Sequence, residues 1–204
     1  TFDPIHYGHL RLAETAREAL GLEGVRLIPA GQPPHRATPG ASGAHRLAMA
    51  RLAAADNPSF EVDPAEVEAA QASFTILTLE RLRATLGTDR PMVLLLGVDA
   101  FLGLPTWRRW TELFDLAHVA VANRPGYTLD ESRLSDELRR HVEQRRAAPE
   151  ALNKAAAGKI ASFSMNPVAF SATDVRSRAA NGQSLRYLLP PPVLDYISRH
   201  QLYS

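Results

Sequence analysis

The sequence has 204 residues, of which 45% are hydrophobic and 22% are charged, and its formal net charge is +1. This length is typical of a single domain, and the balanced charge argues against a general nucleic-acid binder, which usually carries a basic excess. The chain holds no cysteine, which excludes disulfides, thiolate nucleophiles, iron–sulfur clusters and cysteine zinc sites. With no apolar run of about 18 residues and no visible signal peptide, we expect a cytoplasmic protein that does not span a membrane.

Apolar runs and stretches with helical spacing alternate along the chain. In order, we expect a helix over 10–20, a strand over 25–30, helices over 46–55 and 76–86, and strands over 91–97 and 118–123. A basic helix with the stripe Leu134, Leu138 and Val142, a strand over 159–165 and a short helix after the prolines 190–192 complete the order. This alternation predicts an α/β fold, a Rossmann-like parallel sheet with right-handed crossovers and helices on both faces. Such a fold needs a strand before its first helix, and we expect that strand to precede Thr1.

The opening segment TFDPIHYGHL places His6 and His9 three residues apart, with Gly8 between them. At the start of a helix this spacing puts both imidazoles on one face, beside backbone N–H groups that favour an anion. A polar turn that only caps the helix, or a pair of metal ligands, would give the same pattern. The two histidines by themselves leave these alternatives open.

The segment FSATDVRSR, residues 170–178, holds Ser171 and Asp174 at capping-box spacing before a helix. In one interpretation Ser171 only caps that helix. In the other, Ser171, Thr173 and the N–H groups of the first turn bind phosphate oxygens, and Arg176 adds a charge that suits phosphate. Asp174 weakens the second interpretation unless its carboxylate points away.

A loop rich in proline and glycine, residues 31–43, carries a third group of candidates. Its segment QPPHR contains His35 and Arg36, and Arg46 follows downstream. This group would be a binding loop or a solvated basic surface.

The predicted strand over 91–97 ends at Gly97 and is followed by Asp99. Ligands of open α/β sheets bind at the carboxyl ends of the strands, so Asp99 would accept hydrogen bonds from a ribose or hold a metal. Trp107 would stack on a flat heterocycle or lie in the core, and Trp110 is the better core candidate because apolar residues follow it closely.

TFDPIHYGH near one end of the chain and SATDVR near the other are more specific together than apart. The segments PPHR, SFT, LLLGVDAF, PTW and NRPGY lie between them, and LLPPPVLDYISRHQLY follows. In this order the chain resembles the HxGH nucleotidyltransferase superfamily, and within it the bacterial nicotinate-mononucleotide adenylyltransferases, over nearly its whole length. The resemblance implies one nucleotidyltransferase-type domain over residues 1–204, with a C-terminal helical part over 171–204. That family usually has a Gly-Gly pair before TFDP, and we expect this pair, like the first strand, to precede Thr1.

The resemblance implies adenylyl transfer from ATP to nicotinate mononucleotide, giving nicotinate adenine dinucleotide and pyrophosphate in NAD biosynthesis. The attacking phosphate is already anionic, so catalysis would rest on positioning and charge stabilisation by His6, His9 and Arg176. Mg²⁺ would bind mainly through the ATP phosphates and need few protein ligands. The implied ATP site is Thr1, Phe2, Asp3, His6, His9, Gly97, Asp99, Ser171, Thr173 and Arg176. The implied mononucleotide site is His35, Arg36, Arg46, Thr75, Trp107 and Arg108, with Trp107 stacked on the nicotinate ring.

Three alternatives remain beside this interpretation. A phosphopantetheine adenylyltransferase shares the phosphate motifs but lacks the PPH and PTW segments, and an enzyme for nicotinamide mononucleotide is a second rival. A non-catalytic nucleotide-binding module on the same fold is the third, and the intact His6, His9 and Arg176 argue against it. The expected partners are therefore ATP and nicotinate mononucleotide, with no nucleic acid and no membrane, in a monomer or a homo-oligomer.

Overall fold

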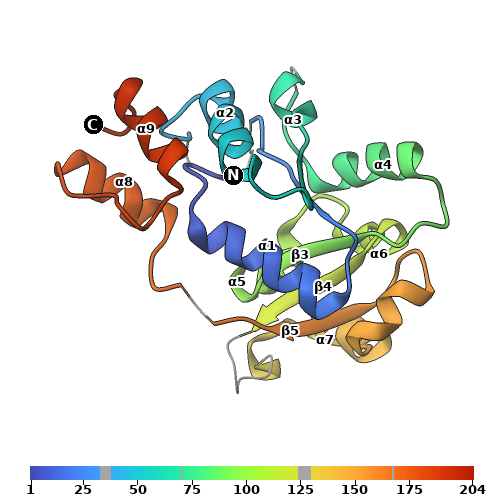
Figure 1. Ribbon diagram of the computed structural model, residues 1–204. Coiled ribbons are helices and arrows are strands. Elements are labelled where there is room, and N and C mark those ends of the chain that lie inside the picture. Colours follow the sequence, from blue (N-terminus) through green and yellow to red (C-terminus); the bar gives the residue numbers. More distant parts are fainter. Residues whose placement is uncertain (33–37, 70, 124–129, 167) are drawn as a thin grey trace. The chain divides into compact units, whose positions relative to one another are not determined.

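The computed structural model describes residues 1–32, 38–69, 71–123, 130–166 and 168–204, and Figure 1 shows its helices and strands. The chain divides into two compact units, which are described separately. Unit 1 comprises Thr1–Glu14, Glu23–Ser73 and Pro167–Ser204, and unit 2 comprises Thr15–Leu22 and Phe74–Asn166. The first helix, α1 (Tyr7–Leu20), contributes residues to both.

Unit 1 combines segments from both ends of the chain. Its parallel strands β1 (Val25–Leu27) and β2 (Phe60–Val62) pair residue by residue. The unit also contains the helices α2 (Gly43–Ala54), α3 (Ala65–Glu68), α8 (Ala172–Ala180) and α9 (Pro191–Arg199). Ile5, Met49, Val175 and Val193 are fully buried in its core. Because Ile5 and Val175 share this core, the segments that hold His6 and Arg176 pack within one unit.

Local sequence explains where the helices of unit 1 begin. The hydroxyl of Ser42 accepts a hydrogen bond from the N–H of His45 at 3.3 Å and caps α2. Ser171 caps α8 in the same manner. α9 begins with prolines, whose missing N–H groups cost nothing in the first turn of a helix.

Unit 2 is built on a parallel three-stranded sheet in the order β3-β4-β5. The helix α4 (Thr75–Leu86) precedes β3 (Val93–Gly97), short elements connect β3 to β4 (His118–Asn123), and α7 (Asp136–Arg145) lies between β4 and β5 (Ile160–Ser164). The short elements are α5 (Val98–Leu102), α6 (Leu113–Leu116) and the 3-10 turns η1 (Leu104–Thr106), η2 (Trp110–Glu112), η3 (Glu131–Arg133) and η4 (Pro149–Lys154). Phe101, Leu113, Val119 and Leu138 are fully buried in its core.

The parallel α/β class predicted from the sequence is confirmed, because the strand pairs in both sheets are parallel. The strand over 118–123 is predicted with its observed bounds, whereas the strands predicted over 25–30, 91–97 and 159–165 are shorter in the structure. Leu134 lies just before α7, yet it is buried with Leu138 and Val142 as the stripe predicts. β2 was not predicted, because its three residues form no apolar run and acquire their strand geometry by pairing with β1. Within the described ranges, no helix is long and apolar enough to cross a bilayer.

Candidate active site

The histidine pair lies at the start of α1. The ring centroids of His6 and His9 are 3.8 Å apart, and the ring planes are tilted by 34°. The backbone N–H of His9 donates to the carbonyl of His6 at 2.9 Å, which begins the first turn of the helix. The i, i+3 spacing therefore brings both imidazoles together, as predicted.

Gly8 is required for this close packing. A Cβ atom at Gly8 would lie 2.8 Å from Cε1 and 2.9 Å from Nδ1 of His6. These distances are below the contact limit of real Cβ atoms, so any other residue would displace the His6 ring. The glycine of the HxGH signature thus leaves room for the first histidine.

Backbone hydrogen bonds set the tautomers of both rings. Nδ1 of His6 accepts the N–H of Gly8 at 3.1 Å, and Nδ1 of His9 accepts the N–H of His6 at 3.3 Å. A neutral imidazole whose Nδ1 accepts carries its proton on Nε2. While neutral, each ring therefore presents an Nε2–H donor.

Burial keeps His6 neutral near pH 7. His6 is 6% exposed, and desolvation lowers its pKa from 6.5 to about 4, an effect that the charge of Asp174 partly offsets. The ring of Phe170 meets His6 edge-on at 5.4 Å, and the ring of Phe2 meets His9 edge-on at 4.9 Å. These aromatic neighbours are part of the low-dielectric surroundings in which hydrogen bonds to phosphate are strengthened.

The start of α8 contains the capping box that the sequence suggests. The hydroxyl of Ser171 donates to Oδ2 of Asp174 at 2.6 Å, and the backbone N–H of Ser171 donates to the same oxygen at 2.7 Å. The N–H of Asp174 donates back to the Ser171 hydroxyl at 3.2 Å. The carboxylate turns toward the start of the helix rather than away from it, and its pKa is lowered mainly by these Ser171 hydrogen bonds. Phosphate binding by Ser171 and Thr173 stays a prediction.

Arg176 reaches from α8 to the opening segment of the chain. Its Nη1 donates to the backbone carbonyl of Asp3 at 2.7 Å and lies 3.6 Å from the Asp3 carboxylate. Its Nη2 donates to the hydroxyl of Thr173 at 3.2 Å. The structure therefore joins Arg176, Asp3 and Thr173, three of the predicted ATP-site residues, in unit 1.

Arg46 is buried and bound to the backbone. It is 1% exposed, and its guanidinium donates to the carbonyls of Thr1, Ala30, Gly31 and Ala41. These contacts hold the two ends of the 31–43 loop next to the opening segment. Its predicted role at the mononucleotide stays a prediction, and His35 and Arg36 lie outside the described residues.

Unit 2 holds the predicted ring-binding residues. Thr75 is the first residue of α4, and the Arg108 guanidinium lies 4.7 Å above the ring centroid of its neighbour Phe74. Trp107 is half-buried at the end of η1 and packs against the core. Trp110 is 7% exposed, so it belongs to the core as predicted. Arg108 therefore contacts the residue that precedes Thr75, and the stacking role of Trp107 stays a prediction.

The carboxyl end of β3 carries the remaining candidates. Gly97 ends the strand, and Asp99 follows in the first turn of α5. The Asp99 side chain is 97% exposed and lies 3.7 Å from the Arg133 guanidinium. An exposed carboxylate at this end of a parallel strand matches the usual location of ligands in open α/β sheets.

The loop before Arg109 is held by ion pairs. Arg109 has a left-handed backbone with φ of 53°, and its guanidinium contacts Glu112 at 2.5 Å and Glu80 at 2.9 Å. Left-handed geometry is uncommon for a residue with a side chain, so these contacts fix the conformation directly after Trp107 and Arg108.

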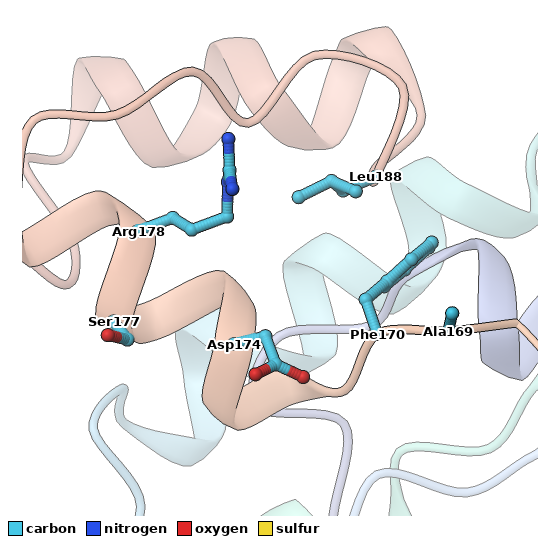
Figure 2. A pocket seen from close by; sticks show the side chains of 6 residues that line it. All are labelled: Ala169, Phe170, Asp174, Ser177, Arg178 and Leu188. Atoms are coloured by element: carbon cyan, nitrogen blue, oxygen red, sulfur yellow. The ribbon is translucent and has the colours of Figure 1, made fainter.

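A cavity of about 380 Å³ lies in unit 1 beside the start of α8. Figure 2 shows Asp174, Ser177 and Arg178 on the helix side and Phe170, Ala169 and Leu188 on the opposite side. Because Phe170 also touches His6, this mixed polar and apolar surface adjoins the histidine pair. Phe170 was not predicted as a site residue, although its place directly before Ser171 was visible in the sequence.

Metal-binding side chains do not gather in the described ranges. Among these residues, no group of three or more His, Asp or Glu side chains is placed to hold a metal ion. The Asp3 carboxylate already accepts hydrogen bonds from two backbone N–H groups and from Tyr203.

Comparisons with known proteins place this chain among nucleotidyltransferases. The cytidylyltransferase-like family model matches residues 1–178. A "Probable nicotinate-nucleotide adenylyltransferase" of Dechloromonas aromatica is 54% identical over 204 residues, covering 100% of this chain and 94% of that protein. The protein of the same name in Aeromonas hydrophila is 48% identical with the same coverage. The structure of Plasmodium falciparum nicotinic acid mononucleotide adenylyltransferase complexed with NaAD has a TM-score of 0.72 at 15% identity, covering 99% of this chain and 93% of that one. This last likeness bears on the fold alone.

Proposed function

We infer that this chain, which belongs to the cytidylyltransferase-like family, is a nicotinate-nucleotide adenylyltransferase that works in NAD biosynthesis. It transfers the adenylyl group of ATP to nicotinate mononucleotide and releases pyrophosphate. The substrates follow from the names of full-length relatives at 48% and 54% identity. The observation that carries the chemistry is the pair of Nε2–H donors of His6 and His9 at the start of α1. Since the family match spans both units, we treat residues 1–204 as one nucleotidyltransferase domain.

The reaction needs charge stabilisation more than a base. A phosphate oxygen of the mononucleotide attacks the α-phosphorus of ATP, a new P–O bond forms, and the bond to the β-phosphate oxygen breaks. The attacking oxygen is already anionic, so no proton has to be removed. Negative charge spreads over the oxygens of the transferring phosphorus, where positioned donors in a dry site act most strongly. We assign this role to His6 and His9.

The leaving pyrophosphate needs its own donors. Arg176 is suited to it because a guanidinium binds phosphate through several N–H groups. The first-turn N–H groups of α8 and the Thr173 hydroxyl would add to this site. The Ser171 hydroxyl is engaged in the capping box, so we assign Ser171 the positioning of these N–H groups. We also place Thr1, Phe2 and Asp3 beside the pyrophosphate end of ATP.

Mg²⁺ fits this site as a partner of the phosphates. Carboxylate clusters of three or more are absent from the described residues, and Mg²⁺ commonly binds through substrate phosphates with few protein ligands. It would supply charge neutralisation of the polyphosphate. Asp99, whose carboxylate is exposed, is the residue we expect nearest to it or to the nucleotide ribose, beside Gly97.

The nicotinate ring is assigned to Thr75, Trp107 and Arg108. Trp107 offers a flat face for the ring, and backbone N–H groups near it would meet the carboxylate. A carboxylate and a carboxamide differ in charge and in donors, so oriented N–H groups discriminate between them. His35, Arg36 and Arg46 are proposed for the phosphate end of the mononucleotide, with Arg46 acting through the loop ends that it holds.

One assay tests the function. The full-length protein is incubated with Mg-ATP and, separately, with nicotinate mononucleotide, nicotinamide mononucleotide and phosphopantetheine, and pyrophosphate release is measured. We expect release with nicotinate mononucleotide at a rate well above the other two. Equal or faster release with another acceptor would reassign the substrate, and no release with any of them would favour a non-catalytic binding module.

A further inference from the structure

We propose that Tyr203 is a positioning residue for the transfer reaction, which acts through the Asp3 carboxylate on Arg176 and on the end of the 31–43 loop. The phenol of Tyr203 donates a hydrogen bond to Oδ1 of Asp3 at 2.8 Å. The proposal rests on the proposed function, because Arg176 is the residue assigned to the leaving phosphates.

The Asp3 carboxylate is the centre of this arrangement. Asp3 is 7% exposed. Its Oδ2 accepts the N–H of Gly40 at 2.8 Å, and its Oδ1 accepts the N–H of Ala41 at 3.1 Å in addition to the Tyr203 hydroxyl. A buried carboxylate is tolerated when several donors satisfy it. The Tyr203 hydroxyl is therefore one of three hydrogen-bond donors that set the position of this charge.

Arg176 depends on the same residue. Its Nη1 donates to the Asp3 carbonyl at 2.7 Å and lies 3.6 Å from Oδ2, while its Nη2 donates to Thr173. The nearer contact goes to the neutral carbonyl, so the guanidinium is not drawn fully onto the carboxylate. Its side chain stays 34% exposed, and its orientation is fixed by contacts at two nitrogens.

Gly40 gives independent evidence that Tyr203 and Arg176 are packed together. A Cβ atom at Gly40 would lie 3.2 Å from Cδ1 and Cε1 of Tyr203 and 3.3 Å from Cδ of Arg176. The ring of Tyr203 and the aliphatic part of Arg176 thus flank one backbone position. This position is also the one whose N–H binds Asp3.

The backbone at Tyr203 is adapted to this contact. Its φ is 66°, and that of Gln201 is 49°, a region that residues with side chains seldom adopt. Observed strain of this kind persists where surrounding contacts determine it. Burial and the Asp3 hydrogen bond raise the pKa of the Tyr203 phenol above its usual range, so the group remains a protonated donor.

Removal of the hydroxyl leaves the Asp3 carboxylate short of one donor. The Arg176 guanidinium lies 3.6 Å from this carboxylate, so the carboxylate would draw it into a tighter ion pair and away from phosphate. The hydroxyl bonds a charged group, and loss of such a bond corresponds to a factor of about ten or more. We therefore expect Tyr203→Phe to raise KM for ATP about tenfold with KM for nicotinate mononucleotide nearly unchanged, beside the lower melting temperature that follows from loss of a hydrogen bond to a buried charge.

The experiment compares Tyr203→Phe with Tyr196→Phe. Tyr196 lies on α9, and its hydroxyl bonds Nδ1 of His45 at 3.0 Å instead of Asp3, so its loss should leave KM for ATP unchanged. A double-mutant cycle with Arg176→Lys measures whether the two substitutions affect KM for ATP independently, as they would if Tyr203 had a purely structural role. If Tyr203 acts through Arg176, Tyr203→Phe changes KM for ATP by less than about twofold in the Arg176→Lys background.

Additive effects in that cycle, equal changes in both KM values, or a change confined to the melting temperature would overturn the proposal. Calorimetric binding of inorganic pyrophosphate separates this proposal from the proposed function. If the native protein shows no adenylyl transfer, the proposed function is wrong, but pyrophosphate binding still tests the role of Tyr203. Tyr203→Phe must still weaken pyrophosphate binding relative to Tyr196→Phe, and equal binding by the two variants would refute the role of Tyr203.

Discussion

At the scale of single residues, the site depends on a few short contacts around the histidine pair. Gly8 supplies an N–H to His6 and leaves space for its ring. The acceptor role of each Nδ1 atom leaves the proton of each neutral ring on Nε2. The motif therefore specifies the proton positions of both imidazoles as well as their place.

Gly8→Ala tests this contact. The new Cβ would collide with the His6 ring, which Phe170 and His9 confine, so the ring must move. We expect kcat to fall about 10²-fold, because displacements of about 1 Å have effects of that size. The collision also costs stability, which the preference of a helix for alanine over glycine partly offsets, so the melting temperature is measured to show that the variant is folded.

Gly103→Ala is the matched control, because its Cβ would meet only ordinary contacts at 3.5 Å or more. Equal activity loss in both variants, or none in Gly8→Ala, would contradict the role given to Gly8.

At the scale of elements, the sequence predicts some features well and others poorly. The strand 118–123 and the stripe of α7 are predictable because apolar side chains mark them directly. The histidine pair follows from helix periodicity. The contact of Tyr203 with Asp3 joins residues 200 positions apart, and no local pattern indicates such a pairing. For the same reason the sequence does not indicate that Arg46 donates to four backbone carbonyls.

Two tryptophans lie in the η1–η2 segment. Trp107 is half-buried, whereas Trp110 is in the core. If Trp107 stacks on the nicotinate ring, Trp107→Ala should raise KM for the mononucleotide about tenfold and KM for ATP much less. Steady-state kinetics with each substrate varied in turn measure both constants. Trp110→Phe should instead lower the melting temperature and leave both KM values unchanged. The same result for Trp107→Ala would show that Trp107 is a core residue that does not bind the ring.

At the scale of the whole molecule, buried neutral histidines link stability to pH. His118 is fully buried, with Nε2 bonded to the Ala155 carbonyl at 2.8 Å and Nδ1 accepting the N–H of Lys159 at 3.0 Å. Desolvation is the main cause that lowers the pKa of His118, and it lowers that of His6 to about 4. As pH falls below about 6.5, the unfolded chain takes up protons that the folded chain does not. Stability is therefore lost as the pH falls below about 6.5, down to about pH 4 for His6, and His118 acts in the same direction.

We predict that the free energy of unfolding, measured by urea titration, declines from pH 7 to pH 4.5. In His118→Gln this decline should be shallower, because glutamine does not titrate, even if the variant is less stable at pH 7. An unchanged slope in the variant would show that His118 makes no contribution to the acid sensitivity.

The histidine pair is expected to stabilise adenylyl transfer to nicotinate mononucleotide. The most direct test is the single-turnover rate of nicotinate adenine dinucleotide formation by the native protein and by His9→Ala, with folding checked by the melting temperature. We predict one pyrophosphate per dinucleotide in the native protein and a rate lower by about 10²–10³-fold in the variant. A folded His9→Ala protein that forms the dinucleotide within a few-fold of the native rate would contradict the account.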